Sequence, residues 1–217
     1  MSDILTLEAD DGLDSIRSEI IYTKTRLEVR EHTRVFVPPF DALLTRWTLV
    51  RDGQLAMWDA ETSAAALVAA ADDDLDDRTG LIVEDVTRSY PKTDPVRQRF
   101  LGKDTKSGIV RMGLATQITR LEGWPDSLRA TAPLAPHADP LAGLLTEGRE
   151  ALAVRVRANS ARADHRVSEI IAFVDDVNGV RRGTYHGLGE YAVENKLPAS
   201  YPKRFFRSRP SPRRTKS

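Results

Sequence analysis

The sequence predicts an all-α protein, an elongated antiparallel helical bundle built on two long helices over about residues 39–77 and 140–178. Apolar residues recur at three- and four-residue spacing through both segments, which is typical of helices that bury one face. Neither segment contains a proline beyond its first residue. The composition, with 41% hydrophobic, 29% charged and 6% aromatic residues, is also closer to a helical protein than to a β-sandwich. Long helices need long partners, so we expect a bundle.

The composition excludes several classes of protein. The 217 residues suit one domain with a real core. The chain has no cysteine, which excludes disulfides, thiolate metal sites and cysteine nucleophiles. The longest apolar run, residues 64–71, is far shorter than the roughly 20 residues of a membrane span, and the acidic N-terminus does not resemble a signal peptide. We therefore expect a soluble, cytoplasmic protein without a membrane partner.

The first helix is predicted to begin with Asp11 as its N-cap, because this carboxylate can accept hydrogen bonds from free N–H groups of the first turn. An inward stripe at helical spacing follows, formed by Leu13, Ile16, Ile20, Thr23 and Leu27. The helix should end before Val37, because a residue that precedes proline is disfavoured in helical geometry. The short Pro38-Pro39 connection predicts that the next helix runs antiparallel to the first.

The first long helix has the most regular stripe in the chain. Its heptad core positions, at the spacing of a coiled coil, are Phe40, Leu43, Trp47, Val50, Gln54, Met57, Glu61, Ala64, Val68, Ala71 and Leu75. Only Gln54 and Glu61 are polar, and such residues in an apolar seam commonly set the register of an association. The pattern weakens after Leu75, and we expect a break or kink near Gly80.

Shorter elements are predicted between the long helices. Asp94-Pro95 is a typical N-cap and first helical residue, and Gly102 a typical stop, which gives a helix over 95–101. A second short helix is predicted over 109–122, where apolar residues share one face. The segment 123–139 contains three prolines and no periodicity. It is predicted to be a proline-rich loop inside the domain.

The second long helix begins at Pro140, with core positions at a mean spacing of 3.6 residues. These positions are Leu141, Leu145, Gly148, Leu152, Val156, Asn159, Ala163, Val167, Ile170, Val174 and Val177. Asn178-Gly179 is a usual helix stop, so the helix is predicted to end at 178. A further helix is predicted over about 180–196.

The charge is distributed unevenly, although the formal net charge is zero. Residues 201–217 carry seven cations and no acid, so residues 1–200 are net acidic. The cations are Lys203, Arg204, Arg207, Arg209, Arg213, Arg214 and Lys216. We predict a single helical-bundle domain over 1–200 and a largely disordered basic tail over 201–217, anchored by Tyr201, Phe205 and Phe206.

The motifs of common enzymes and metal proteins are absent from the sequence. No histidine has an acid three residues earlier, as the glutamates and histidines of di-metal bundles require. In neither register does the aspartate run of residues 72–77 supply both the glycine and the glutamate of a calcium loop. Residues 187–192 match the dinucleotide-binding pattern by letter, but no strand precedes them. Residues 102–108 resemble a P-loop only in composition, because Thr105 replaces the glycine before the lysine and a helix precedes them. We therefore assign no catalytic residue, no metal ligand and no cofactor.

Charged residues are the candidates for interaction. The aspartate run of 72–77 is predicted to face the basic segment of the second long helix, which contains Arg155, Arg157, Arg162 and Arg166. This pairing would act within one chain or across a dimer interface. The tail combines cations with aromatic rings, a composition that favours phosphates and bases.

Our leading hypothesis is a non-enzymatic helical-bundle protein that acts through protein–protein interaction, as a homodimer. Its candidate interaction residues are Gln54, Glu61, Arg155, Arg162, Arg166, Lys203, Arg204, Arg207, Arg209, Arg213 and Arg214. The alternative is a nucleic-acid-associated protein whose tail contacts an anionic partner. The third hypothesis is a bundle enzyme or metal protein.

Overall fold

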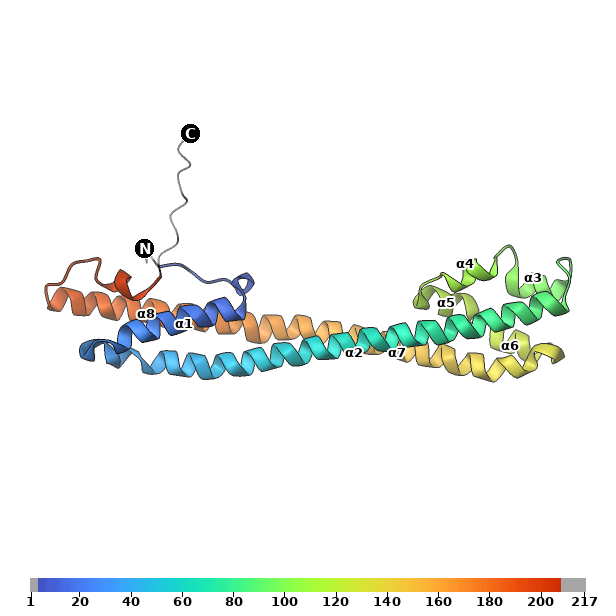
Figure 1. The fold of residues 1–217 in the computed structure, drawn as a ribbon, viewed down its shortest axis with the longest axis horizontal. Coiled ribbons are helices and arrows are strands. Elements are labelled where there is room, and N and C mark those ends of the chain that lie inside the picture. Colours follow the sequence, from blue (N-terminus) through green and yellow to red (C-terminus); the bar gives the residue numbers. More distant parts are fainter. Residues whose placement is uncertain (1–3, 208–217) are drawn as a thin grey trace, which may run out of the picture. The chain divides into compact units, whose positions relative to one another are not determined.

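The computed structural model describes residues 4–207, which contain helices and turns but no strand (Figure 1). The all-α bundle predicted from the sequence is therefore confirmed. The helices are α1 (Leu13–Glu28), α2 (Pro38–Ser89), α3 (Pro95–Leu101), α4 (Lys106–Val110), α5 (Leu114–Leu121), α6 (Trp124–Arg129), α7 (Ala138–His165) and α8 (Ala172–Glu194). Short 3-10 helices cover Ala9–Asp11, Glu31–Phe36, Ala132–His137 and Pro202–Phe205, and a π-helical turn covers Arg166–Ile171.

The chain forms two compact units. The first unit comprises residues 1–56 and 163–217, and the second comprises residues 57–162. Each unit has its own hydrophobic core. The predicted single domain over 1–200 stays a prediction, because two units that share continuous helices can still fold as one domain.

In the first unit, α1 buries the stripe that the sequence predicts, from Leu13 to Leu27. The predicted N-cap is wrong, since the helix follows Gly12, whose φ of 82° suits a glycine. Asp11 instead belongs to the preceding turn, where its side chain accepts a hydrogen bond of 2.7 Å from the backbone N–H of Glu8. The carboxylate therefore stabilises the turn before the helix.

Helix α2 continues to Ser89, beyond the predicted end at residue 77 and without a break at Gly80. A side chain at Gly80 would lie 3.2 Å from the Cε atom of Lys106, so this glycine allows a close approach and does not interrupt the helix. The predicted stripe is confirmed where it meets a core, because Phe40, Trp47 and Leu75 are buried.

The short helices of the second unit follow their capping residues. Helix α3 has the predicted bounds, and the Asp94 side chain accepts a hydrogen bond of 2.8 Å from the N–H of Val96. The predicted helix over 109–122 is instead two helices, α4 and α5, with Gly113 at the N-cap of α5. Thr105 caps α4 by accepting from the N–H of Gly108.

The prediction of a proline-rich loop over 123–139 is wrong. This segment forms α6 and a 3-10 helix, and it contributes Trp124, Leu128 and Leu134 to the core of the second unit. Pro125 lies in the first turn of α6, where a missing N–H removes no helical hydrogen bond. Prolines at such positions start helices and do not prevent them.

The predicted stop at Asn178-Gly179 is also wrong, because α8 continues to Glu194. The Asn178 side chain meets a partner from another part of the chain: its Oδ1 accepts from the N–H of Leu7 at 3.0 Å, and its Nδ2 donates to the Leu7 carbonyl at 2.8 Å. Two predicted core positions, Val156 and Val167, are each 65% exposed. The π-helical turn of Arg166–Ile171 adds a residue to one turn, which shifts the face that later residues present.

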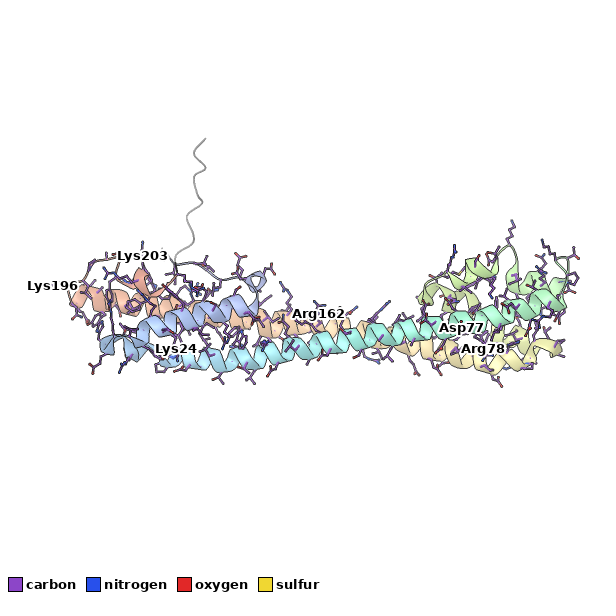
Figure 2. All side chains as sticks on the ribbon, in the orientation of Figure 1. Lys24, Asp77, Arg78, Arg162, Lys196 and Lys203 are labelled. Atoms are coloured by element: carbon purple, nitrogen blue, oxygen red, sulfur yellow. The ribbon has the colours of Figure 1, made fainter. Side chains whose placement is uncertain are left out.

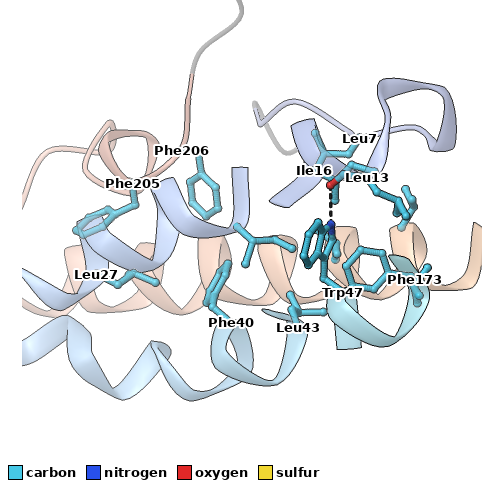
Figure 3. Close-up of a cluster of buried hydrophobic side chains, with 14 of the residues drawn as sticks. Leu7, Leu13, Ile16, Leu27, Phe40, Leu43, Trp47, Phe173, Phe205 and Phe206 are labelled. Atoms are coloured by element: carbon cyan, nitrogen blue, oxygen red, sulfur yellow. Dashed lines mark hydrogen bonds between the residues drawn. The ribbon is translucent and has the colours of Figure 1, made fainter. Parts of the chain in front are cut away.

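The core of the first unit is organised around Trp47 (Figure 3). The indole N–H donates a hydrogen bond of 2.8 Å to the carbonyl of Leu13 in the first turn of α1. Tyr201, Phe205 and Phe206 are buried in the same core, so the predicted aromatic anchors are confirmed. The remaining tail lies outside the described residues from residue 208 onward.

Replacing Asn178 with alanine should lower the free energy of unfolding by about 1–3 kcal/mol, because it leaves the buried N–H and C=O of Leu7 without partners. Asn159→Ala is the matched control, since Asn159 is exposed on α7 and the change in helix propensity is the same. Urea denaturation followed by circular dichroism measures both variants. Hydrogen exchange at the Leu7 amide should accelerate only in Asn178→Ala, and equal stability of the two variants would contradict the assigned role.

Candidate interaction surfaces

The basic segment of the second long helix does not face the aspartate run. Arg162 forms an ion pair with Glu61, and Arg166 forms one of 2.6 Å with Asp10. Arg155 is exposed and has no ion pair among the described residues. Figure 2 shows Arg162 well separated from Asp77 along the helices. Within one chain the predicted pairing is therefore wrong, because Arg162 and Arg166 meet other acids. A pairing across a dimer interface stays a prediction.

The two polar residues of the α2 stripe have different surroundings. Glu61 is half-buried and pairs with Arg162, so it joins α2 to α7 within one chain. Gln54 is half-buried in the first unit. A pair across two helices of one chain sets their register, and the role of these residues in self-association stays a prediction.

The aspartate run contacts a buried amide. Gln117, which is fully buried on α5, donates a hydrogen bond of 2.7 Å from Nε2 to Asp76. Its Oε1 has no hydrogen-bond partner, and neither has the hydroxyl of Thr79, another fully buried residue. Burial raises the pKa of Asp76 above its ordinary value; the hydrogen bond from Gln117 opposes this shift, and the charges of Asp72, Asp73 and Asp77 add to it. Asp76 is therefore held in an environment that disfavours its charge.

An open cavity of about 800 Å³ adjoins this carboxylate. Its lining residues are Asp73, Asp76, Asp77, Gly80, Leu81, Glu84, Lys106 and Val110. Lys106 is paired with Glu84, which leaves the cavity with a negative surface. Among residues 4–207, no group of three or more His, Asp or Glu side chains is placed to hold a metal ion. The cavity thus presents carboxylates to solvent without forming a metal centre.

Arg207, a residue of the predicted tail, takes part in an ion-pair network around Glu19 and the buried Arg181. Arg181 on α8 is fully buried, and it contacts Glu19 at 3.5 Å and the carbonyl of Leu5 at 3.3 Å. Desolvation lowers the pKa of Arg181, and the charge and hydrogen bond of Glu19 oppose that shift. Arg207 reaches the other oxygen of Glu19 at 3.2 Å. Arg207 therefore fastens the end of the described chain to α1.

The other predicted tail residues lie at the surface or outside the described part. Lys203 and Arg204 are exposed on the last 3-10 helix. Arg204 lies beside Arg26 and Arg30, two arginines that belong to no motif of the sequence. A helical spacing of four residues links Arg26 to Arg30, but nothing in the sequence connects them to residue 204. Arg209, Arg213 and Arg214 lie outside the described residues.

A second stripe of small and apolar residues is exposed on α2 in the second unit. Trp58 is 43% exposed, and Thr62, Ala65 and Ala69 follow it at four-, three- and four-residue spacing, all exposed. Each residue of this stripe directly follows a residue of the predicted core stripe, at positions 57, 61, 64 and 68. Within residues 57–71, only Ala64 is buried. Helix α2 therefore carries an apolar face wider than its contacts within the unit cover.

No family model, curated protein or solved structure matches this chain. In the part of the chain that the structure describes, no helix combines the length and apolar content needed to cross a membrane. The function has to be inferred from the residues themselves.

Asp76→Asn should stabilise the protein at neutral pH, since asparagine accepts the same hydrogen bond from Gln117 without a charge in this environment. A raised pKa means that this carboxyl favours folding below its ordinary pKa of about 4 and loses that contribution as the pH rises through the folded-state value. The advantage of the variant should therefore be largest at pH 7 and shrink towards pH 4.5. Urea midpoints at several pH values measure it.

Asp77→Asn is the control, because Asp77 is exposed and does not contact Gln117. It removes the same charge from the run and should change the urea midpoint less than Asp76→Asn. A lower midpoint for Asp76→Asn at pH 7 would show that the carboxylate is needed in its charged form.

Proposed function

We propose that this protein is a non-enzymatic helical-bundle protein that acts through self-association, with a second copy packed on the exposed apolar face of α2. The single observation that supports this is the second stripe of Trp58, Thr62, Ala65 and Ala69. A helix with one partner needs only a narrow apolar seam, whereas a helix inside a bundle needs a wider face. Helix α2 has the wider face between residues 57 and 71.

The surroundings of this stripe favour a helical partner. In the second unit, the arginine of the Glu61–Arg162 pair comes from α7, so one side of α2 is already occupied. Alanines at 65 and 69 allow a close approach of another helix backbone, and Trp58 offers a large apolar surface at one end. In a two-fold dimer each copy would supply the same stripe, which gives a closed, self-complementary contact.

Trp58→Glu should convert the dimer into a monomer at micromolar concentration, because a buried charge without a partner opposes association. Val193→Glu is the matched control, since Val193 is also an exposed apolar helix residue, at 81% exposure, and lies in the first unit. Size-exclusion chromatography with light scattering measures the mass of both variants. Circular dichroism should show equal helix content.

Tryptophan fluorescence gives a second readout. Trp47 and Trp124 are buried within their units, so dilution should shift the emission through Trp58 alone. We expect a shift to longer wavelength as the dimer dissociates. The proposal would be excluded if the unsubstituted protein were monomeric at micromolar concentration and its emission did not depend on concentration.

The alternative of nucleic-acid association keeps support from the basic composition of the tail. Because Tyr201, Phe205 and Phe206 belong to the core, the tail should be removed after Arg207 and not after Ser200. Loss of salt-dependent binding to single-stranded DNA in that shortened chain would favour the alternative. The cytoplasm stays the expected compartment for either function.

A further inference from the structure

Three arginines from different parts of the chain surround one small cavity in the first unit. Arg26 and Arg30 come from the end of α1 and the residues after it, and Arg204 comes from the last 3-10 helix. The cavity measures about 80 Å³, and Val29 and Phe205 complete its lining. No carboxylate lines it. Like charges have therefore been brought together at a concave surface.

The contacts of these arginines hold them in place without neutralising them. Arg26 donates from Nε to the carbonyl of Arg204 at 3.1 Å. The guanidinium groups of Arg30 and Arg204 lie 5.8 and 5.9 Å from the centre of the buried Tyr201 ring. Arg30 also donates to the Tyr201 hydroxyl at 3.5 Å. These contacts with a carbonyl, a hydroxyl and an aromatic face orient a guanidinium but leave its charge uncompensated.

Two acids of α1 pair with other cations. Glu28 pairs with Lys24 at 2.8 Å, and Glu19 pairs with Arg181 and Arg207. None of the ion pairs among the described residues involves the three arginines of the cavity. An incoming anion would therefore meet no protein carboxylate already bound to them.

Stabilisation of the helix end does not account for the cluster. Cations near a helix C-terminus interact favourably with its free carbonyls. At the end of α1, however, the Thr33 hydroxyl donates to the carbonyl of Leu27, and Arg34 donates to the carbonyl of Glu28 at 3.1 Å. These carbonyls are satisfied by residues outside the cavity, so Arg26 and Arg30 are available for another ligand.

We propose that Arg26, Arg30 and Arg204 form a binding site for a phosphoryl oxyanion. Guanidinium groups present paired N–H donors that match the oxygens of phosphate, and they remain charged at any physiological pH. The cavity is small, at about 80 Å³, which suits a single tetrahedral anion. The site is distinct from the α2 face proposed for self-association and does not depend on it.

The test is titration of the full chain with inorganic phosphate at constant ionic strength, measured by isothermal calorimetry. We expect one site per chain, and chloride at the same ionic strength should produce no such binding. The triple variant Arg26→Gln, Arg30→Gln, Arg204→Gln should weaken phosphate binding by about tenfold or more. Arg88→Gln, an exposed arginine in the second unit, should leave it unchanged and controls for the loss of a positive charge.

Circular dichroism and thermal unfolding of the triple variant separate binding from folding, because the variant should keep the unfolding midpoint of the natural protein in the absence of phosphate. The single variant Arg30→Gln keeps the test valid if the triple variant is destabilised. Absence of phosphate binding to the natural protein, or equal binding by the arginine variants, would overturn the proposal.

A second titration distinguishes the source of the phosphoryl group. A short single-stranded oligonucleotide that competes with inorganic phosphate, and that loses affinity in the triple variant, would assign the site to a phosphate of a nucleic acid. Phosphate binding without such competition would assign it to a free oxyanion. Both results support the site, and they identify its ligand.

Discussion

Burial of the apolar stripe of α2 is the constraint on which the rest of the structure depends. No isolated helix can bury its own face, so every section of α2 needs a partner. In the first unit the core around Trp47 draws on α1, α8 and the aromatic residues near the end of the described chain. In the second unit, Leu75 packs in a core with residues of the short helices and α7. Between residues 57 and 71 the burial is incomplete, and that is where we place the contact with a second copy.

Buried polar groups then define which arrangement of these helices is stable. An apolar stripe alone tolerates several registers, whereas a hydrogen bond is satisfied in only one. Asn178 holds the backbone of Leu7, and the indole of Trp47 holds the carbonyl of Leu13. Arg181 adds a charged contact to Glu19 at the same end of the sequence. Within the first unit, these groups tie the N-terminal residues to α2 and α8 in one specific position.

Most charged side chains, in contrast to these buried polar groups, remain at the surface. There each ion pair contributes only about 0–1 kcal/mol. The most informative charged groups are those gathered in clusters of like charge. Among the aspartates of residues 72–77, Asp76 contacts Gln117, and its charged form is disfavoured. The arginines at positions 26, 30 and 204 gather without an acid. These two clusters are where we propose a bound anion and expect a stability that depends on pH.

The helical class, the stripes of α1 and α2 and the caps of α3 can be predicted from the sequence, because periodicity and capping act over neighbouring residues. Features that depend on distant residues become visible only in the folded chain. Pro125 lies in the first turn of a helix that contributes Trp124 to the core. Asn178 lies inside α8, where its side chain bonds to the backbone of Leu7. The arginine site was equally out of reach, because Arg204 meets Arg26 only through folding. Local patterns encode which residues must be buried, and packing in three dimensions selects what buries them.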